Sequence, residues 1–348
     1  MAHPGPWHTS GHGTPGTRPP PKNGCTRVTS HPVNKIVYGN YRTPASHHQP
    51  QTTIEMHDYR TRLTIVNLAM CTFHTIFAAV VFGTANMRLS VPMYDTALTF
   101  HVASSTEGMR LTPVYVESGD LRVSWLAVAF FACSAVTHLG NAVLWRSFYL
   151  DGLASGRCIS RWVEYFVSAS VMMLAIAYTS GIRGYTELFQ IFALTATTMT
   201  FGCLNEVINR PSRTGNDLWE RPLHIRAQAH LCGYIPQFAA WYCILYAFLG
   251  AADSSVCGPP GFVYVIVLGE AGVFFSFGAP QLYQVLAPPS RYVYGEYAYQ
   301  MLSLTSKALL GMTLLVNVLI YDSFDEVLSG IEPGSGLTLE DVGSGLGC

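Results

Sequence analysis

Apolar and polar residues alternate in long blocks between residues 60 and 320 of the chain. The apolar blocks are about 20 residues long, which is the length that an α-helix needs to cross the hydrocarbon core of a bilayer. Short breaks rich in glycine, proline or charged residues separate them, as at residues 181–184 and 288–291. The pattern predicts an all-α membrane protein with seven transmembrane helices, at residues 63–83, 121–143, 162–180, 188–208, 229–250, 263–285 and 297–320.

Composition supports a membrane protein. Only 12% of the residues are charged, 49% are hydrophobic and the mean hydropathy is +0.26, whereas a soluble domain has about 25% charged residues. Residues 1–60 are rich in Pro, Gly, His, Ser and Thr, so we expect a disordered segment there. We expect one seven-helix domain at residues 61–321 and an acidic tail at residues 322–348. This chain would be a multi-pass protein of the cell membrane, surrounded by lipid, with no nucleic-acid partner, no metal site and no enzymatic activity.

Basic residues gather on one side of the predicted helices, and this asymmetry predicts their orientation. They precede the first helix and occupy the loops after the second and fourth helices, whereas acidic residues dominate the first loop and the tail. Because short basic loops face the cytoplasm, we expect a cytoplasmic N-terminus and an extracellular C-terminus. The basic side contains Lys35, Arg42, Arg60, Arg62, Arg146, Arg157, Arg210, Arg213, Arg221 and Arg226.

The first external loop, residues 85–120, is too long for a simple connection. Two runs of alternating apolar and polar residues, 98–102 and 114–116, flank a turn-like segment at residues 104–108. This arrangement predicts a β-hairpin. Pro113 indicates that its strand is short or lies at an edge, because proline has no backbone donor for a ladder.

Two ionisable residues within the predicted helices indicate chemistry. Lys307 lies near the middle of the last helix, where a charge costs about 2.5–3.5 kcal/mol on insertion scales unless a partner compensates it. Glu164 lies in the third helix, at a depth that the Lys307 side chain can reach. Arg161 is one turn earlier on the same face, and we expect it to keep Glu164 ionised. A purely structural ion pair, or an interfacial Arg–Glu pair at a helix end, is the alternative that these residues leave open.

The residues around this pair resemble the heliorhodopsins, a family of microbial retinal proteins with inverted membrane topology. The run Arg161–Tyr165, followed by Ser168–Ser170, is similar to their third-helix counterion motif, and Ser303 four residues before Lys307 is similar to their retinal-attachment motif. The resemblance covers about residues 60–321 and continues through the fourth helix at Met199, Phe201, Gly202, Asn205 and Glu206. Ala196 departs from it, since relatives commonly have an amide there, and this puts the colour tuning in doubt.

The resemblance implies that all-trans retinal is bound to Lys307 as a protonated Schiff base with Glu164 as its counterion. It also implies that Ser134 and Ser303 form hydrogen bonds around the Schiff base, and that His74 and His138 line a hydrated cavity and accept the photoreleased proton. Ordinary helix packing is the alternative for both histidines. A retinal slot needs flat and apolar walls, and the candidates are Tyr165, Ser168, Met172, Met199, Phe274, Phe275 and Phe277.

These features predict a light sensor whose photoisomerisation drives a regulatory conformational change and signals to a cytoplasmic partner. Glu270 in the sixth helix predicts either a protonated carboxyl bonded to a neighbouring helix or part of a proton path, so a light-gated channel or transporter is the alternative function. A transporter without retinal should show internal repeats, and a G-protein-coupled receptor should have an external N-terminus. By resemblance, the hairpin reaches a neighbouring protomer, which implies a homodimer.

Overall fold

The computed structural model describes residues 52–102, 109–209, 221–254, 258–287 and 291–320. Seven helices in these ranges are long and apolar enough to cross a membrane, and they confirm the predicted seven-helix bundle. Helices suit this environment because they satisfy their own backbone hydrogen bonds where lipid offers none. The seven spans are Tyr59–Thr84, Val123–Leu144, Ile159–Thr179, Tyr185–Ile208, Gln228–Asp253, Gly261–Leu286 and Tyr292–Leu319.

Several spans contain more than one helical segment. The second joins α2 to a π-helical turn, η1, and the last joins α11 to η5. The sixth span is the most divided, since α8, η3, α9 and α10 follow one another. Their bounds are α1 Thr52–Thr84, α2 Val123–Leu139, η1 Gly140–Leu144, α3 Arg146–Ala154, α4 Ile159–Thr179, α5 Tyr185–Ile208, α6 Leu223–Arg226, α7 Gln228–Ser254, α8 Gly261–Tyr264, η3 Val265–Gly269, α9 Glu270–Ser276, α10 Gly278–Leu286, α11 Tyr292–Leu314 and η5 Leu315–Leu319.

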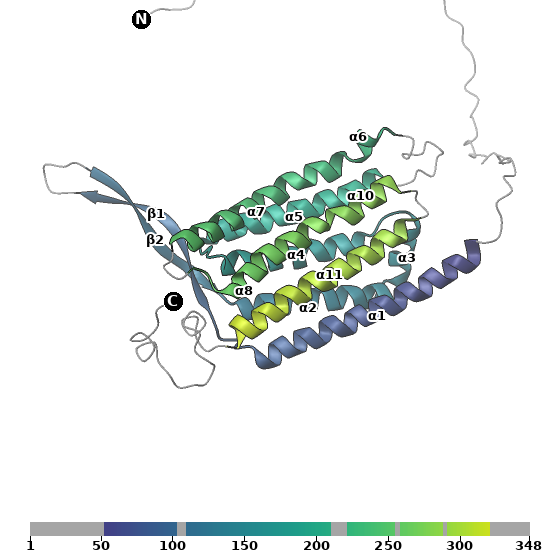
Figure 1. Ribbon diagram of the computed structural model, residues 1–348, viewed down its shortest axis with the longest axis horizontal. Coiled ribbons are helices and arrows are strands. Elements are labelled where there is room, and N and C mark those ends of the chain that lie inside the picture. Colours follow the sequence, from purple (N-terminus) through teal and green to yellow (C-terminus); the bar gives the residue numbers. More distant parts are fainter. Residues whose placement is uncertain (1–51, 103–108, 210–220, 255–257, 288–290, 321–348) are drawn as a thin grey trace, which may run out of the picture. The chain divides into compact units, whose positions relative to one another are not determined.

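Helix α4 lies in the middle of the bundle, between α2 and α5 (Figure 1). Its buried residues include Trp162, Glu164, Tyr165 and Met172, so both polar and aromatic side chains of α4 face other helices. The outward faces of the surrounding helices expose large apolar residues such as Ile235, as expected for helices in contact with lipid. The candidate chemistry of α4 is therefore enclosed by protein.

The predicted β-hairpin is present and is longer than expected. Strands β1, Val91–Val102, and β2, Met109–Leu121, pair antiparallel, with an irregularity between Met93 and Tyr94. With two strands in the sheet, Pro113 necessarily lies in an edge strand, as predicted. The predicted turn at residues 104–108 lies within residues 103–108, outside the described residues.

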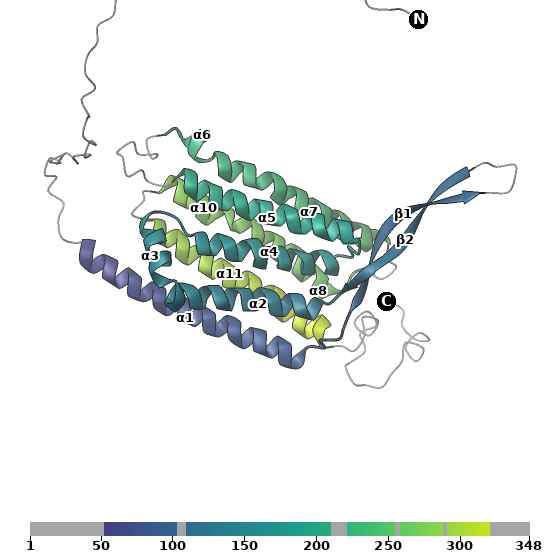
Figure 2. The ribbon, with the colours of Figure 1, turned by 180° about the vertical axis from the view of Figure 1, so that it is seen from behind.

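The base of the hairpin is attached to the loop before α5. Tyr94 N donates to Arg183 O at 2.9 Å, and Asp95 Oδ1 accepts hydrogen bonds from Thr186 N at 3.3 Å and Thr186 Oγ1 at 3.0 Å. In Figures 1 and 2 the hairpin leaves one end of the bundle, and α3 and α6 lie at the other. We call these the hairpin end and the α3 end.

One predicted boundary is wrong. Helix α1 begins at Thr52, within the segment that we expected to be disordered up to residue 60. Hydropathy detects the part of a helix that lies in lipid and misses a polar extension beyond it. Residues 1–51 and 321–348, with most of the predicted disordered segment and the acidic tail, lie outside the described residues.

Candidate functional site

A buried cluster of polar side chains surrounds Lys307. The Lys307 Nζ lies 3.1 Å from Glu164 Oε1 and donates to Ser303 Oγ at 2.6 Å. Ser134 Oγ donates to the same Glu164 oxygen at 2.6 Å. All four residues are at most 4% exposed. The structure thus brings together the predicted lysine, carboxylate and both serines from α2, α4 and α11.

Helical spacing explains this convergence. Ser303 and Lys307 are four residues apart on α11, so they share one face of that helix. The same spacing puts Ser134 and His138 on one face of α2. Helix α4 lies beside α2 in the middle of the bundle. Glu164 of α4 can therefore contact both the Ser134 face of α2 and the Lys307 face of α11.

The two predicted histidines lie side by side near this cluster. The rings of His74 and His138 stack with centroids 5.6 Å apart and an interplanar angle of 13°. The Nδ1 atom of His138 lies 2.8 Å from Asn67 Oδ1, whereas neither nitrogen of His74 has a hydrogen-bond partner among the described residues. The hydrated cavity expected around them stays a prediction.

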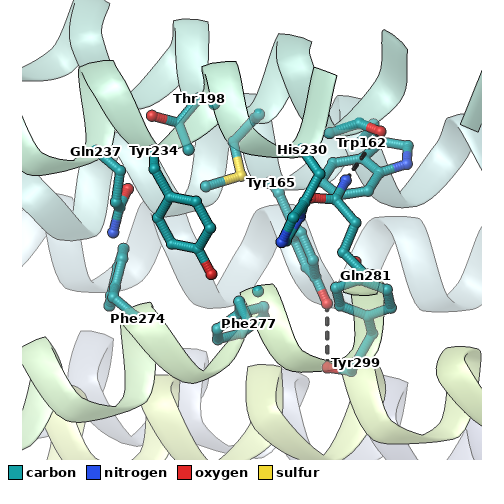
Figure 3. Close-up of a pocket in the computed structure, with 14 residues that line it drawn as sticks. Trp162, Tyr165, Thr198, His230, Tyr234, Gln237, Phe274, Phe277, Gln281 and Tyr299 are labelled. Carbon is teal, nitrogen blue, oxygen red and sulfur yellow. Dashed lines mark hydrogen bonds between the residues drawn. The ribbon is translucent and has the colours of Figure 1, made fainter. Parts of the chain in front are cut away.

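A cavity directly beside Lys307 contains several of the predicted pocket residues. Its lining includes Tyr165, Met172, Met199, Phe274, Phe277, Ser303 and Lys307. A second cavity extends from it between α4, α5, α7, α9, α10 and α11 and shares Tyr165, Met199, Phe274 and Phe277 with the first (Figure 3). Because the two cavities share these aromatic and thioether side chains, they lie next to each other. We refer to them together as the apolar slot.

Two predicted pocket residues have different surroundings. Phe275 packs against Phe238 and Trp241 of α7, with ring centroids 5.0 and 6.3 Å away. Ser168 is fully buried on α4, and its hydroxyl has no hydrogen-bond partner in the described part of the chain. Neither residue belongs to the lining of the two cavities.

The expectation that Arg161 supports Glu164 is wrong. The Arg161 guanidinium forms ion pairs with Glu206 of α5 and Glu296 of α11 instead. It also lies over the ring of Tyr299, with its Cζ atom 4.0 Å from the ring centroid. Other helices supply closer carboxylates than the neighbouring turn of α4 does, and the arginine turns toward them.

Sequence reasoning missed Glu296 and the tyrosines around it. Tyr149 OH donates to Glu296 Oε1 at 3.0 Å, and Tyr292 OH donates to Glu206 Oε1 at 2.7 Å. Tyr149 lies outside the spans, in α3, and burial raises the pKa of its hydroxyl well above the ordinary value, so it stays a donor. The sequence does contain a pattern that could have indicated Glu296. Polar residues on α11 follow one another at spacings of 4, 3 and 4 and therefore share one face of the helix: Glu296, Gln300, Ser303 and Lys307.

Glu270 lies closer to Lys307 than its sequence position suggested. It is fully buried directly after the π-helical turn η3, and its Oε2 accepts a hydrogen bond from Ser306 Oγ at 2.7 Å. Ser306 is the residue before Lys307. This arrangement is a carboxyl bonded to a neighbouring helix, which is the first of the two interpretations that the sequence allowed.

A comparison with protein families gives an independent result. The family model described as heliorhodopsin matches residues 63–319, which is most of the chain and includes every residue of the site. No curated protein matches the sequence significantly. The match begins within the first span and ends with the last one, so it covers the bundle apart from residues 59–62. On this evidence the chain belongs to the heliorhodopsin family.

Proposed function

We propose that this heliorhodopsin is a light sensor that carries all-trans retinal on Lys307 as a protonated Schiff base, with Glu164 as the counterion. Membership of the family implies a retinal-binding, light-responsive membrane protein. The observation that carries the finer proposal is the buried pair of Lys307 and Glu164, whose charged atoms are 3.1 Å apart beside an apolar slot.

The residues of this chain fit retinal. The sequence has three lysines, Lys22, Lys35 and Lys307, and only Lys307 lies within the seven spans. Its amine borders a slot with thioether and aromatic walls, which suit a flat polyene. The slot continues past Phe274 and Phe277 into the second cavity (Figure 3). This extension supports the binding of a ligand longer than the lysine side chain.

Each polar group of the site has a role in this proposal. When bound, retinal supplies the conjugated system that absorbs light and isomerises. Glu164 keeps a positive charge on the Lys307 nitrogen, which would otherwise lose its proton in a medium of low dielectric constant. Ser134 donates to Glu164 Oε1 and Ser303 accepts from Lys307 Nζ, so the two hydroxyls fix the positions of both charges.

A sensory role is favoured over pumping by the distribution of carboxylates. A pump needs carboxylates near the lysine and along paths for proton exit and reuptake. Glu206 and Glu296 are paired with Arg161, which leaves Glu164 and Glu270 as the carboxylates next to Lys307 and its neighbour Ser306.

We further propose a cytoplasmic N-terminus and α3 end, a cytoplasmic signalling partner and a homodimer in which the hairpin contacts the second protomer.

Visible absorption of the purified protein with added retinal tests this proposal. The intact chain should form a coloured pigment, and Lys307→Ala should form none because the attachment atom is gone. Thr305→Ala is a matched control, since Thr305 is two residues away on α11 and exposed. Normal colour in Lys307→Ala, or a colourless intact protein, would refute the proposal.

The second candidate function is a light-gated proton path through Glu270. It is favoured by the buried hydrogen bond from Ser306 to Glu270, which puts a second carboxyl one residue from the attachment lysine. Photocurrent recordings from cells that express the full chain separate the two functions. A current that Glu270→Gln abolishes would establish the proton path. Absence of current in the unchanged chain would exclude the proton path and favour the light-sensor function.

A further inference from the structure

A second group of buried ionisable residues lies toward the α3 end of the bundle. Arg161 pairs with Glu206 on one side and Glu296 on the other, and the three side chains are 3%, 2% and 2% exposed. One guanidinium faces two carboxyl groups, so full ionisation would leave one uncompensated negative charge. Tyr149, Tyr292 and the thiol of Cys158 donate hydrogen bonds to these carboxyl groups, and the ring of Tyr299 lies against Arg161, so none of these neighbours supplies a second positive charge.

An excess charge in such a site is strongly disfavoured. Burial penalises a charge that no opposite charge compensates, and two carboxylates that share a site resist ionising together. Binding of one proton removes the excess charge and leaves a single ion pair with Arg161. The charge count therefore favours one proton shared by Glu206 and Glu296.

Hydrogen-bond distances indicate which carboxyl holds the proton. Besides Arg161, Glu206 accepts short bonds from Tyr292 OH at 2.7 Å and from the backbone N of Cys158 at 2.7 Å. Besides Arg161, the donors to Glu296 are more distant, at 3.0 Å for Tyr149 OH, 3.5 Å for Gln300 Nε2 and 3.7 Å for Cys158 Sγ. Because a carboxylate is stabilised by close donors, the shorter bonds favour the negative charge on Glu206 and the proton on Glu296.

Gln300 provides an independent indication of a proton at this position. Its side-chain amide contacts both Glu296 and Tyr149, yet its Oε1 has no hydrogen-bond donor in the described part of the chain. The residue is 3% exposed. A buried acceptor without a donor is costly, and rotation of the amide by 180° would offer this oxygen to a proton on Glu296.

The same carboxyl is connected to the histidine pair near Lys307. From Glu296, hydrogen bonds lead through Tyr149 OH to Asn67 Nδ2 at 3.4 Å, and Asn67 Oδ1 lies 2.8 Å from His138 Nδ1. Asn67 Nδ2 also donates to Leu63 O at 2.8 Å, which orients the amide. Asn67 Oδ1 is then the acceptor, so the neutral His138 carries its proton on Nδ1 and keeps Nε2 free to accept another.

A polar cavity lies on the other side of Tyr149 and Cys158. It has a volume of about 180 Å³ and is lined by nine residues between 148 and 160, from α3, the following loop and the start of α4, including Asp151, Ser155 and Arg157. Because one water needs roughly 10–15 Å³ of such volume, this cavity has room for several. Water there would be one side chain away from Glu296.

We propose that Glu206 and Glu296 form a second proton-binding site, which holds one exchangeable proton on Glu296 and is linked through Tyr149 and Asn67 to His138. The proton exchanges with water in the cavity at the α3 end by way of the Tyr149 hydroxyl, which lines that cavity: the Glu296 O–H bond breaks as its proton leaves along this hydrogen bond, and an equivalent proton returns from water to Glu296, so the charge of the site is unchanged. A second consequence rests on the proposed retinal function: a positive charge that arrives at His138 after illumination perturbs the Glu296 carboxyl through this chain.

Infrared spectroscopy of the full-length protein in the dark tests the proton site. Glu296→Gln should lose one band of a protonated carboxylic acid. Glu206→Gln should lose the same band, because Arg161 then balances Glu296 alone and the proton is no longer required. Glu187→Gln is the matched control, since Glu187 is an exposed carboxylate on the same helix as Glu206, and it should leave the band unchanged.

Tyr149→Phe provides a milder variant if a charge-removing substitution prevents folding. The band should shift, because Glu296 loses its nearest donor besides Arg161, and transfer to D₂O should shift the band of the unchanged protein as its proton exchanges. Retention of the band in Glu206→Gln, or an unshifted band in Tyr149→Phe, would overturn the proposal. These dark spectra need no chromophore, so they are readable even if the retinal proposal fails, and a light-induced shift of the band tests the second consequence.

Discussion

The amine of Lys307 and the carboxylate of Glu164 lie 3.1 Å apart in the centre of the bundle, and both side chains are buried. Two helices that are distant in the sequence supply them, and a hydroxyl from a third helix, Ser134, fixes the carboxylate. In a medium of low dielectric constant each charge depends on the other. This mutual dependence underlies the first prediction.

Glu164→Gln should change the colour of the pigment. Without the carboxylate, the positive charge on the Lys307 nitrogen loses its compensation, so the pigment should lose its proton and absorb at much shorter wavelength, or bind an external anion and shift in an anion-dependent way. Visible spectra recorded with and without chloride distinguish these outcomes. An unchanged spectrum, matching that of the exposed control Glu187→Gln, would mean that Glu164 is not the counterion.

Arg161→Met should destabilise the fold with little effect on colour. The substitution leaves two buried carboxyl groups without their cation, and removal of one partner from a buried ion pair costs about 3–5 kcal/mol. Thermal unfolding followed by circular dichroism measures the loss, with Arg157→Met in the adjacent loop as the control. A colour shift as large as that of Glu164→Gln would restore the discarded view that Arg161 acts on Glu164.

Gly202→Ala should destabilise the bundle and disturb the second cavity. An added Cβ at Gly202 would meet the indole ring of Trp162, which lines that cavity. Overpacking of this kind costs about 1–3 kcal/mol. Gly272→Ala is the opposite case, because no atom lies within 4 Å of its added Cβ, and a helical alanine should be neutral or stabilising by up to about 1 kcal/mol. Equal melting temperatures for the two variants would contradict the tight contact between α4 and α5.

Asp95→Ala should loosen the base of the hairpin. Asp95 accepts two hydrogen bonds from Thr186 in the first turn of α5, where backbone donors lack partners within the helix. Loss of such a cap costs about 1 kcal/mol. Hydrogen exchange should become faster at the start of α5 and in β1, while the core of α4 keeps its protection. Uniform protection in both proteins would argue against this anchor.

The bundle could be predicted from the sequence because the apolar blocks have the length that a bilayer requires, and the alternating runs of the first loop indicated the hairpin. Glu164 followed from its depth as a partner of Lys307, whereas Ser134 and Ser303 were expected from the family resemblance. The partners of Arg161 could not be predicted in this way. Spacing shows which residues share a face of one helix, but Glu206 and Glu296 come from two other helices, and their distance from Arg161 depends on how those helices are rotated.

The sixth span limited the prediction of the pocket for a similar reason. Phe274, Phe275 and Phe277 are close in sequence, and each successive residue of a helix points about 100° further round. The π-helical turn η3, just before α9, changes the register of the faces that follow. Phe274 and Phe277, three residues apart, line the slot, whereas Phe275 points elsewhere and packs against Phe238 and Trp241 of α7.

Reductive trapping of the chromophore tests the central claim most directly. Full-length protein is incubated with all-trans retinal, reduced with borohydride, digested and examined by peptide mass spectrometry. A retinyl mass on the peptide that contains Lys307, with none on the peptides of Lys22 or Lys35, is the predicted result. A label on either of those lysines, or a pigment that forms without any labelled lysine, would contradict attachment at Lys307.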